Sequence, residues 1–282
     1  GAGGGGGSGG GSWGGEGGWQ GAGLGCGAAV ALYVGRGRVA VRNEAAVGSA
    51  TMATLVRAGV SGGGRSKEHA QGMSWETAQA VGVRPASIHD LYAARGRGEV
   101  KGFTVPAMNV RGMAYDTARA IFRTAVRMHA GAFILEIARS EIAYTGQRPS
   151  EYVTVMLAAA LREGFRGPVF IQGAHFQVNA KKFAADPTGE VAAVKQLALE
   201  AVSAGFYNID VDTSTLVDIH LPTLDAQQDP NYDTASDIVA SVLSSQPPGL
   251  TSPTGGRVGE LGPLDRTVAE RRAPSTARRL RP

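Results

Sequence analysis

The sequence contains a single cysteine, Cys26, among its 282 residues. One thiol cannot close an internal disulfide, which favours a reducing compartment. No apolar run approaches the roughly 18 residues that a membrane-spanning helix needs. No positively charged stretch followed by an apolar one opens the sequence, as a signal peptide would. These absences predict a cytoplasmic protein that does not have the membrane as a partner.

Acidic side chains are scarce at both ends of the sequence. Residues 1–72 hold three of the 24 acidic and six of the 28 basic side chains, and residues 266–282 hold one and six. The 16 basic and 20 acidic side chains that remain make the central part net negative, although the whole chain carries +4. A net acidic body argues against nucleic-acid binding, so no nucleic-acid partner is expected. The basic tail alone could bind polyanions weakly.

Glycine is concentrated in the first segment, since residues 1–72 carry 25 of the 42 glycines. Such a segment loses too much backbone entropy to order itself. We therefore predict that residues 1–72 are disordered or non-native, with a flexible linker from another domain as the alternative. A partial barrel is predicted for residues 73–262, and a basic, disordered tail for 263–282.

The central part alternates short apolar runs with helical stretches, at the spacing of a βα unit. This alternation predicts an α/β fold with a parallel sheet. No Gly-x-Gly-x-x-Gly follows a predicted strand, so a (β/α)8 TIM-barrel type is favoured over a doubly wound sheet. About five βα units are present, so the barrel is expected to be incomplete or completed by a partner. The predicted strands are 103–105 (running on to 109), 133–137, 169–171 and 206–211, and their helices are 115–128, 150–163, 187–204 and 225–243.

Polar side chains gather at the carboxyl ends of these strands, which meet on one face of a barrel. A histidine among carboxylates suits a divalent metal ion, zinc above all. Two alternatives without a role in chemistry stay open. His175 could be a structural histidine, and Glu136 could be a buried charge paired with Arg139 or Lys181. Of the two aspartates on the fourth strand, only Asp212 is expected to face the site. The polar residues are Asn109, Glu136, Arg139, Ser140, Glu141, His175, Asp210, Asp212 and Glu260.

Five stretches carry a resemblance that covers roughly residues 74–262. They are 83–92 (VRPASIHDLY), 103–110 (FTVPAMNV), 171–177 (IQGAHFQ), 205–214 (GFYNIDVDTS) and 260–262 (ELG). In this order the sequence resembles the class II, zinc-dependent fructose- and tagatose-bisphosphate aldolases. The resemblance implies a lyase that reversibly cleaves a ketose 1,6-bisphosphate into dihydroxyacetone phosphate and glyceraldehyde 3-phosphate. It also implies a TIM barrel, a Zn²⁺ cofactor, a phosphorylated ketose substrate and a homo-oligomer.

The same resemblance implies roles for individual residues. His175 and Glu260 are similar to metal ligands of that family, and Asn109 and Ser140 to residues that contact the substrate. Asp212 is similar to the aspartate of its fourth strand and is a candidate catalytic residue.

Two departures from the family pattern affect the expected activity. Ala174 stands where the family has its catalytic aspartate, and alanine cannot transfer a proton. No histidine follows Glu260 to supply further ligands. We therefore expect a weak or incomplete zinc site and impaired activity. The alternative is a non-catalytic, accessory barrel that needs a partner chain.

Overall fold

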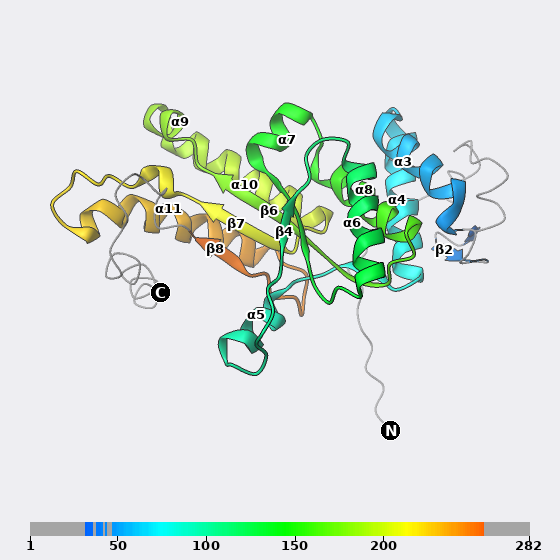
Figure 1. The fold of residues 1–282 in the computed structure, drawn as a ribbon. Coiled ribbons are helices and arrows are strands. Elements are labelled where there is room, and N and C mark those ends of the chain that lie inside the picture. Colours follow the sequence, from blue (N-terminus) through cyan, green and yellow to red (C-terminus); the bar gives the residue numbers. More distant parts are fainter. Residues whose placement is uncertain (1–31, 36–37, 42, 44–46, 257–282) are drawn as a thin grey trace, which may run out of the picture.

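The computed structural model describes residues 32–35, 38–41, 43 and 47–256 (Figure 1). Its centre is a parallel sheet in which each strand pairs with the next one along the chain, in the order β4-β5-β6-β7-β8. A further short strand, β3, pairs in parallel with the start of β6. The strands of this sheet are β3 (Val83–Pro85), β4 (Ala107–Asn109), β5 (Ile134–Ala138), β6 (Gly167–Gln177), β7 (Asn208–Asp212) and β8 (Thr254–Gly256).

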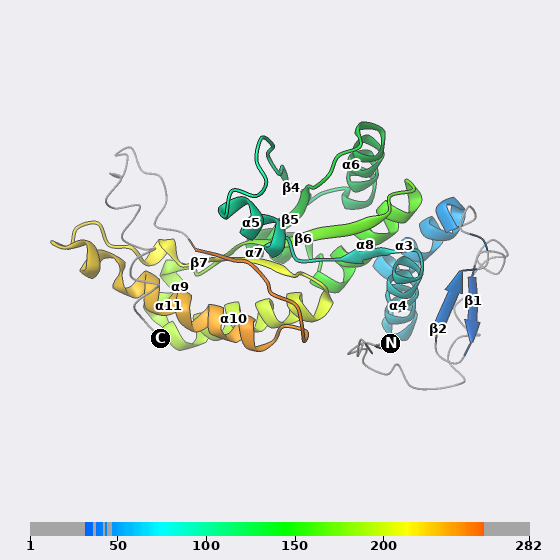
Figure 2. The same cartoon turned by 90° about the horizontal axis from the view of Figure 1, so that it is seen from below.

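Four long helices cover one face of the sheet, and each packs against the next (Figure 2). Consecutive strand order with the helices on one face is the arrangement of a (β/α) barrel, whereas a doubly wound sheet reverses its order. The predicted α/β fold with a parallel sheet of βα units is confirmed, and the described strands form an open part of such a barrel. No helix in these described ranges is long and apolar enough to cross a membrane. The four helices are α6 (Ala114–Met128), α8 (Pro149–Arg162), α10 (Pro187–Ala204) and α11 (Leu224–Ser244).

The remaining elements are short or lie N-terminal to the sheet. β1 and β2 form a separate antiparallel pair. These elements are β1 (Leu32–Gly35), β2 (Arg38–Val41), the π-helix η2 (Val47–Thr51), α3 (Met52–Ser61), α4 (Gly64–Ala80), α5 (His89–Gly96), α7 (Arg139–Thr145), α9 (Ala180–Ala185) and the 3₁₀-helix η3 (Ser214–Leu216).

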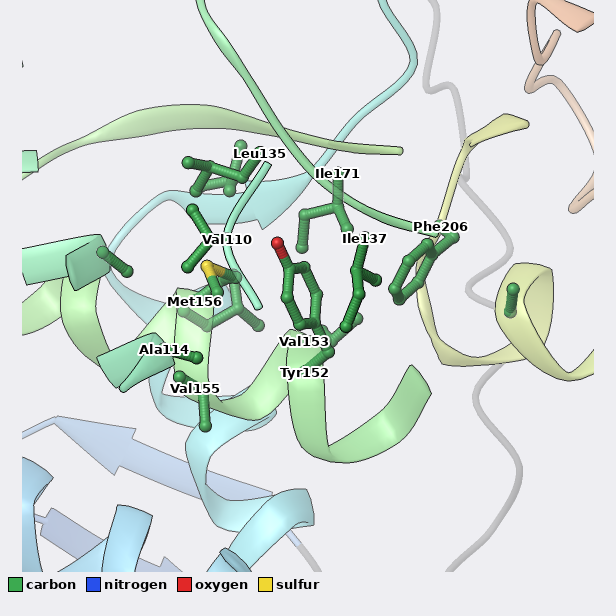
Figure 3. Close-up of a cluster of buried hydrophobic side chains, with 14 of the residues drawn as sticks. Val110, Ala114, Leu135, Ile137, Tyr152, Val153, Val155, Met156, Ile171 and Phe206 are labelled. Carbon is green, nitrogen blue, oxygen red and sulfur yellow. The ribbon is translucent and has the colours of Figure 1, made fainter. Parts of the chain in front are cut away.

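The main core lies between the sheet and helix α8. Leu135 and Ile137 of β5 are fully buried, whereas Glu136 between them is only partly buried. Tyr152 and Met156, one turn apart on α8, belong to the same cluster (Figure 3). Side chains alternate between the two faces of a strand. The face of the sheet away from the helices therefore carries Glu136 and the other polar side chains of the strands.

Ordered helices begin before the predicted boundary at residue 73. Helices α3 and α4 pack against α8, and Met52, Leu55 and Met73 are fully buried there. These two helices are stabilised by this packing rather than by local helix propensity. The glycine-rich composition of residues 1–72 therefore did not indicate them. Residues 1–31 and 257–282, and with them the predicted basic tail and Glu260, lie outside the described residues.

The start of helix α10 follows the sequence closely. Asp186 is the N-cap, and its Oδ1 accepts a hydrogen bond of 2.9 Å from the Gly189 N–H. Pro187 is the first helical residue, where its missing N–H costs no hydrogen bond. This cap fixes the point at which helix α10 begins, a few residues after the carboxyl end of β6.

Gly205 ends helix α10 and is expected to tolerate no side chain. Its φ is +110°, and a Cβ there would lie 3.0 Å from Trp75 Cζ3 and 3.1 Å from Pro85 Cγ. We expect Gly205→Ala to lower the free energy of unfolding by about 2–3 kcal/mol, through backbone strain and crowding together. Gly164→Ala is the matched control, because Gly164 has φ +72° but open space around it. Urea denaturation of both variants should show the larger loss at Gly205, and equal losses would contradict the crowding argument.

Candidate active site at the carboxyl end of the sheet

Strand β6 is longer than the sequence predicted and contains a bulge. It runs to Gln177 rather than ending at residue 171, and its pairing with β7 shifts register between Gly173 and Phe176. His175 therefore lies inside the strand, with a φ of +44°. A left-handed conformation costs a non-glycine residue roughly 1–2 kcal/mol. Bulges of this kind re-aim a side chain, and here the bulge positions the imidazole of His175.

A fully buried carboxylate holds this imidazole. Nδ1 of His175 lies 3.4 Å from Asp212 Oδ2, and the same oxygen accepts a hydrogen bond of 2.9 Å from Gln177 Nε2. Asp212 Oδ1 accepts from Ser214 N at 3.1 Å and from Ser214 Oγ at 2.6 Å. With both oxygens engaged, Asp212 is fixed in place and can orient the imidazole, whose side chain is 43% exposed. This is the relation between an orienting carboxylate and a histidine that transfers protons.

Asp210 also faces the site, so the prediction that only Asp212 would do so is wrong. The backbone N–H of His175 donates to Asp210 Oδ2 at 3.3 Å. Residues two apart on a strand share a face, since successive side chains point to opposite sides. Ile209 and Val211, which alternate with the aspartates, are buried in the helix-facing core. The alternation of apolar and acidic residues along this strand therefore already indicates that both aspartates lie on one face.

Glu136 lies on the same face, one strand further along. Its Oε2 accepts a hydrogen bond of 2.8 Å from Gln172 Nε2. Burial has the largest effect and raises the pKa of Glu136. The hydrogen bond from Gln172 and the charge of His175 lower this pKa, whereas the negative charges of Asp210 and Glu141 raise it further. The net effect is a pKa above the usual range of a glutamate. Glu136 therefore keeps its proton to a higher pH than an ordinary carboxyl and can serve as a general acid.

Glu136 is also held through its backbone. Its carbonyl accepts from the Val110 N–H at 3.0 Å and from the Tyr152 hydroxyl at 2.9 Å. Figure 3 shows the Tyr152 hydroxyl pointing from α8 toward the strands. Burial raises the pKa of Tyr152 well above its usual value, so the phenol stays protonated and donates throughout the working range of pH.

Arg139 pairs with Glu190 and not with Glu136. The alternative in which Glu136 is a buried charge paired with Arg139 is therefore wrong. Nη1 and Nη2 of Arg139 lie 2.5 and 3.2 Å from the two carboxylate oxygens of Glu190, and Nη1 also donates to Gln177 O at 2.7 Å. The Asn179 N–H donates to Glu190 Oε1 at 2.8 Å. This network joins the start of α7, the end of β6 and the first turn of α10, and so supports the strand that carries His175.

The other predicted site residues lie at the same end of the sheet or outside the described part. Asn109 ends β4 and is exposed, and Ser140 is exposed in the first turn of α7. Ala174 is buried and pairs in register with Ala138. The binding roles of Asn109 and Ser140 stay predictions.

A zinc ion needs three or four ligands from histidine, cysteine and carboxylate side chains. Within residues 32–35, 38–41, 43 and 47–256, no group of three such side chains is arranged to hold one metal ion. Of the two predicted ligands, His175 has its Nδ1 turned to Asp212, and Glu260 falls outside these ranges. The described side chains alone do not form a zinc site, and the site predicted with Glu260 stays a prediction.

Comparison with known proteins shows a distant likeness to solved structures in fold alone. No family model matches the chain, and no curated protein matches it. Among solved structures, the chain is similar to a probable tagatose 6-phosphate kinase from Sinorhizobium meliloti 1021, with 18% identity and a TM-score of 0.40. The match covers 57% of this chain and 41% of that one, so this chain spans less than half of the kinase's length.

The predicted membership of the class II aldolase family is wrong by these comparisons. No model of that family matches the chain, and the similar solved structure named above is described as a probable kinase and not as an aldolase. The five stretches that suggested the family are short. Residues 260–262 lie outside the described residues, and each of the other four contains strand residues of the sheet. Strand ends of (β/α) folds share such polar and glycine-rich patterns across unrelated functions.

Proposed function

We propose that this chain binds a phosphorylated ketose at the carboxyl end of its sheet and transfers protons in the reversible cleavage of a carbon–carbon bond, the one between the carbon next to the ketone and the hydroxyl-bearing carbon beyond it. The pairing of His175 with the buried Asp212 supports this proposal most directly. A carboxylate at Nδ1 keeps the proton on that nitrogen and makes Nε2 the basic one. Glu136, with its raised pKa, supplies an acid on the same face.

The proposed proton path uses only these groups. Nε2 of His175 takes the proton from a substrate hydroxyl, and the bond between that carbon and the carbon next to the ketone breaks. The hydroxyl-bearing fragment leaves as an aldehyde. The bonding electron pair becomes the double bond of an enediol, whose oxygen takes a proton from Glu136. The enediol then returns to the ketone when the imidazolium of His175 protonates its carbon and the Glu136 carboxylate takes back the proton from its oxygen, which restores both residues.

Proton exchange tests this chemistry, because dihydroxyacetone phosphate gives the same enediol in the reverse direction. The protein is incubated with this ketose phosphate in D₂O, and the loss of the proton signal beside the ketone is followed by NMR. We expect exchange with the wild-type protein and a loss of about 10²–10⁴-fold in His175→Asn, which removes the base.

His220→Asn is the matched control, since His220 is exposed in the segment between η3 and α11. Its exchange rate should equal that of the wild type. Equal rates in His175→Asn and wild type would refute a role for His175 in proton transfer.

A second candidate is a binding protein without chemistry that acts together with a partner chain. Within the described sheet, β4 and β8 are edge strands with a neighbour on one side only. An edge strand offers unpaired backbone groups to another chain. Ketose-phosphate binding by the wild-type protein without proton exchange would favour this candidate over the first.

A further inference from the structure

Arg111 stands at the edge of the site in the segment between β4 and α6. Its Nε lies 2.9 Å from Glu141 Oε1 and 3.3 Å from Asn109 Oδ1. Glu141 is itself fixed, because its Oε2 accepts a hydrogen bond of 2.8 Å from the Ala138 N–H. The guanidinium of Arg111 is thus oriented by contacts at its Nε, while its side chain remains 53% exposed.

The other arginines around the site use their guanidinium groups differently. Arg139 directs both terminal nitrogens at Glu190, and Arg148 meets Glu200 with Nε and a terminal nitrogen. Arg111 donates its hydrogen bond through Nε, which is also its nearest nitrogen to Glu141. Its two terminal amino groups make no hydrogen bond with the described residues and are available for a ligand.

Arg111 is also close to the acid–base residues. Asn109, which contacts Arg111, is the register partner of Glu136 across β4 and β5. The charge of Glu141, the other partner of Arg111, acts on the carboxyl of Glu136. Arg111 therefore contacts the residue that pairs with Glu136 across the sheet.

We propose that Arg111 binds the phosphate group of the ligand through its two terminal amino groups. A guanidinium presents a planar fork that matches two oxygens of a phosphate, and charge-assisted bonds of this kind are about twice as strong as neutral ones. Orientation through Nε reduces the entropy that the side chain loses on binding. This inference rests on the proposed function for the identity of the ligand, but not for the phosphate contact itself.

The test compares Arg111→Gln with Arg148→Gln, whose side chain is 52% exposed and also paired with a glutamate. Inorganic phosphate, dihydroxyacetone phosphate and unphosphorylated dihydroxyacetone are titrated into each protein by calorimetry. We expect Arg111→Gln to weaken the binding of both phosphate compounds about tenfold or more, which is the typical loss of a charge-assisted bond. The affinity for dihydroxyacetone should not change, and Arg148→Gln should bind all three compounds like the wild type.

The outcomes separate this inference from the proposed function. If Arg111→Gln binds phosphate as tightly as the wild type, the role of Arg111 is refuted even where proton exchange is intact. If the wild type shows Arg111-dependent phosphate binding but no proton exchange, the phosphate contact stands and the proposed chemistry fails. Equal weakening in both arginine variants would also overturn the proposal, because it would reflect net charge alone.

Discussion

Asp212→Asn is expected to reduce proton exchange by about a hundredfold or more and to lower the free energy of unfolding by about 2 kcal/mol. The carboxylate accepts from donors at both oxygens: the amide and hydroxyl of Ser214 at Oδ1, and Gln177 at Oδ2, beside His175 Nδ1. An asparagine has one oxygen and one amino group. Whichever way it is turned, its amino group faces a donor inside a fully buried site, which leaves a polar group unsatisfied.

The loss of activity has a separate cause from the loss of stability. Without the charge of Asp212, nothing favours the proton on Nδ1 of His175, so the ring spends less time with Nε2 as the base. Asp225→Asn is the matched control, since Asp225 lies in the first turn of α11 and is exposed. Urea denaturation and the NMR exchange assay measure the two effects. An Asp212→Asn protein with wild-type exchange would show that the imidazole needs no orienting carboxylate.

The sequence predicted the elements whose signals are local. The alternation of strands and helices gave the parallel sheet, and Asp186 with Pro187 located the start of α10. The predictions of the sheet and of this helix start succeeded because strand alternation and helix caps depend on neighbours in the chain. His175 and Asp212, which the sequence named as candidates, lie with their side chains 3.4 Å apart, and their roles stay predictions.

The features that the sequence did not reveal depend on tertiary packing. Helices α3 and α4 are stabilised by contact with α8, which no local pattern shows. The bulge at His175 depends on the pairing of β6 with β7, so its residues looked like the end of the strand. The partners that fix the site, Gln172 and Gln177, are ordinary polar residues until the strands are aligned. The family assignment failed because short motifs at strand ends do not distinguish one (β/α) fold from another.

Arg139→Met is expected to lower the free energy of unfolding by about 3–5 kcal/mol near neutral pH, since it leaves a buried carboxylate without its partner. The side chain of Glu190 is 3% exposed and that of Arg139 20% exposed. Burial alone would raise the pKa of Glu190, but the hydrogen bonds from Arg139 and Asn179 and the charges of Arg139 and Lys182 lower it below its usual value. The ionised form of Glu190 therefore stabilises the fold.

The sign of the pH dependence follows from this direction. A carboxyl whose pKa is lowered on folding contributes stability above its unfolded pKa, and the contribution is lost as the pH falls through the lowered value. In Arg139→Met the partner is gone, so burial raises the pKa of Glu190 and protonation relieves the unpaired charge. The deficit of the variant relative to wild type should therefore shrink as the solution is acidified from about pH 7 toward about pH 4.

Arg148→Met provides the matched control, because Arg148 and Glu200 form an exposed pair that is expected to contribute less than about 1 kcal/mol. Urea denaturation of both variants across this pH range measures the effect. A deficit in Arg139→Met that does not change with pH would mean that lost packing of the arginine stem, and not the unpaired charge of Glu190, destabilises the protein. The hydrogen bonds of Arg139 also anchor the end of β6. A loss of stability caused by the unpaired charge of Glu190 would therefore mean that the stability of α10 and the position of His175 depend on the same interactions.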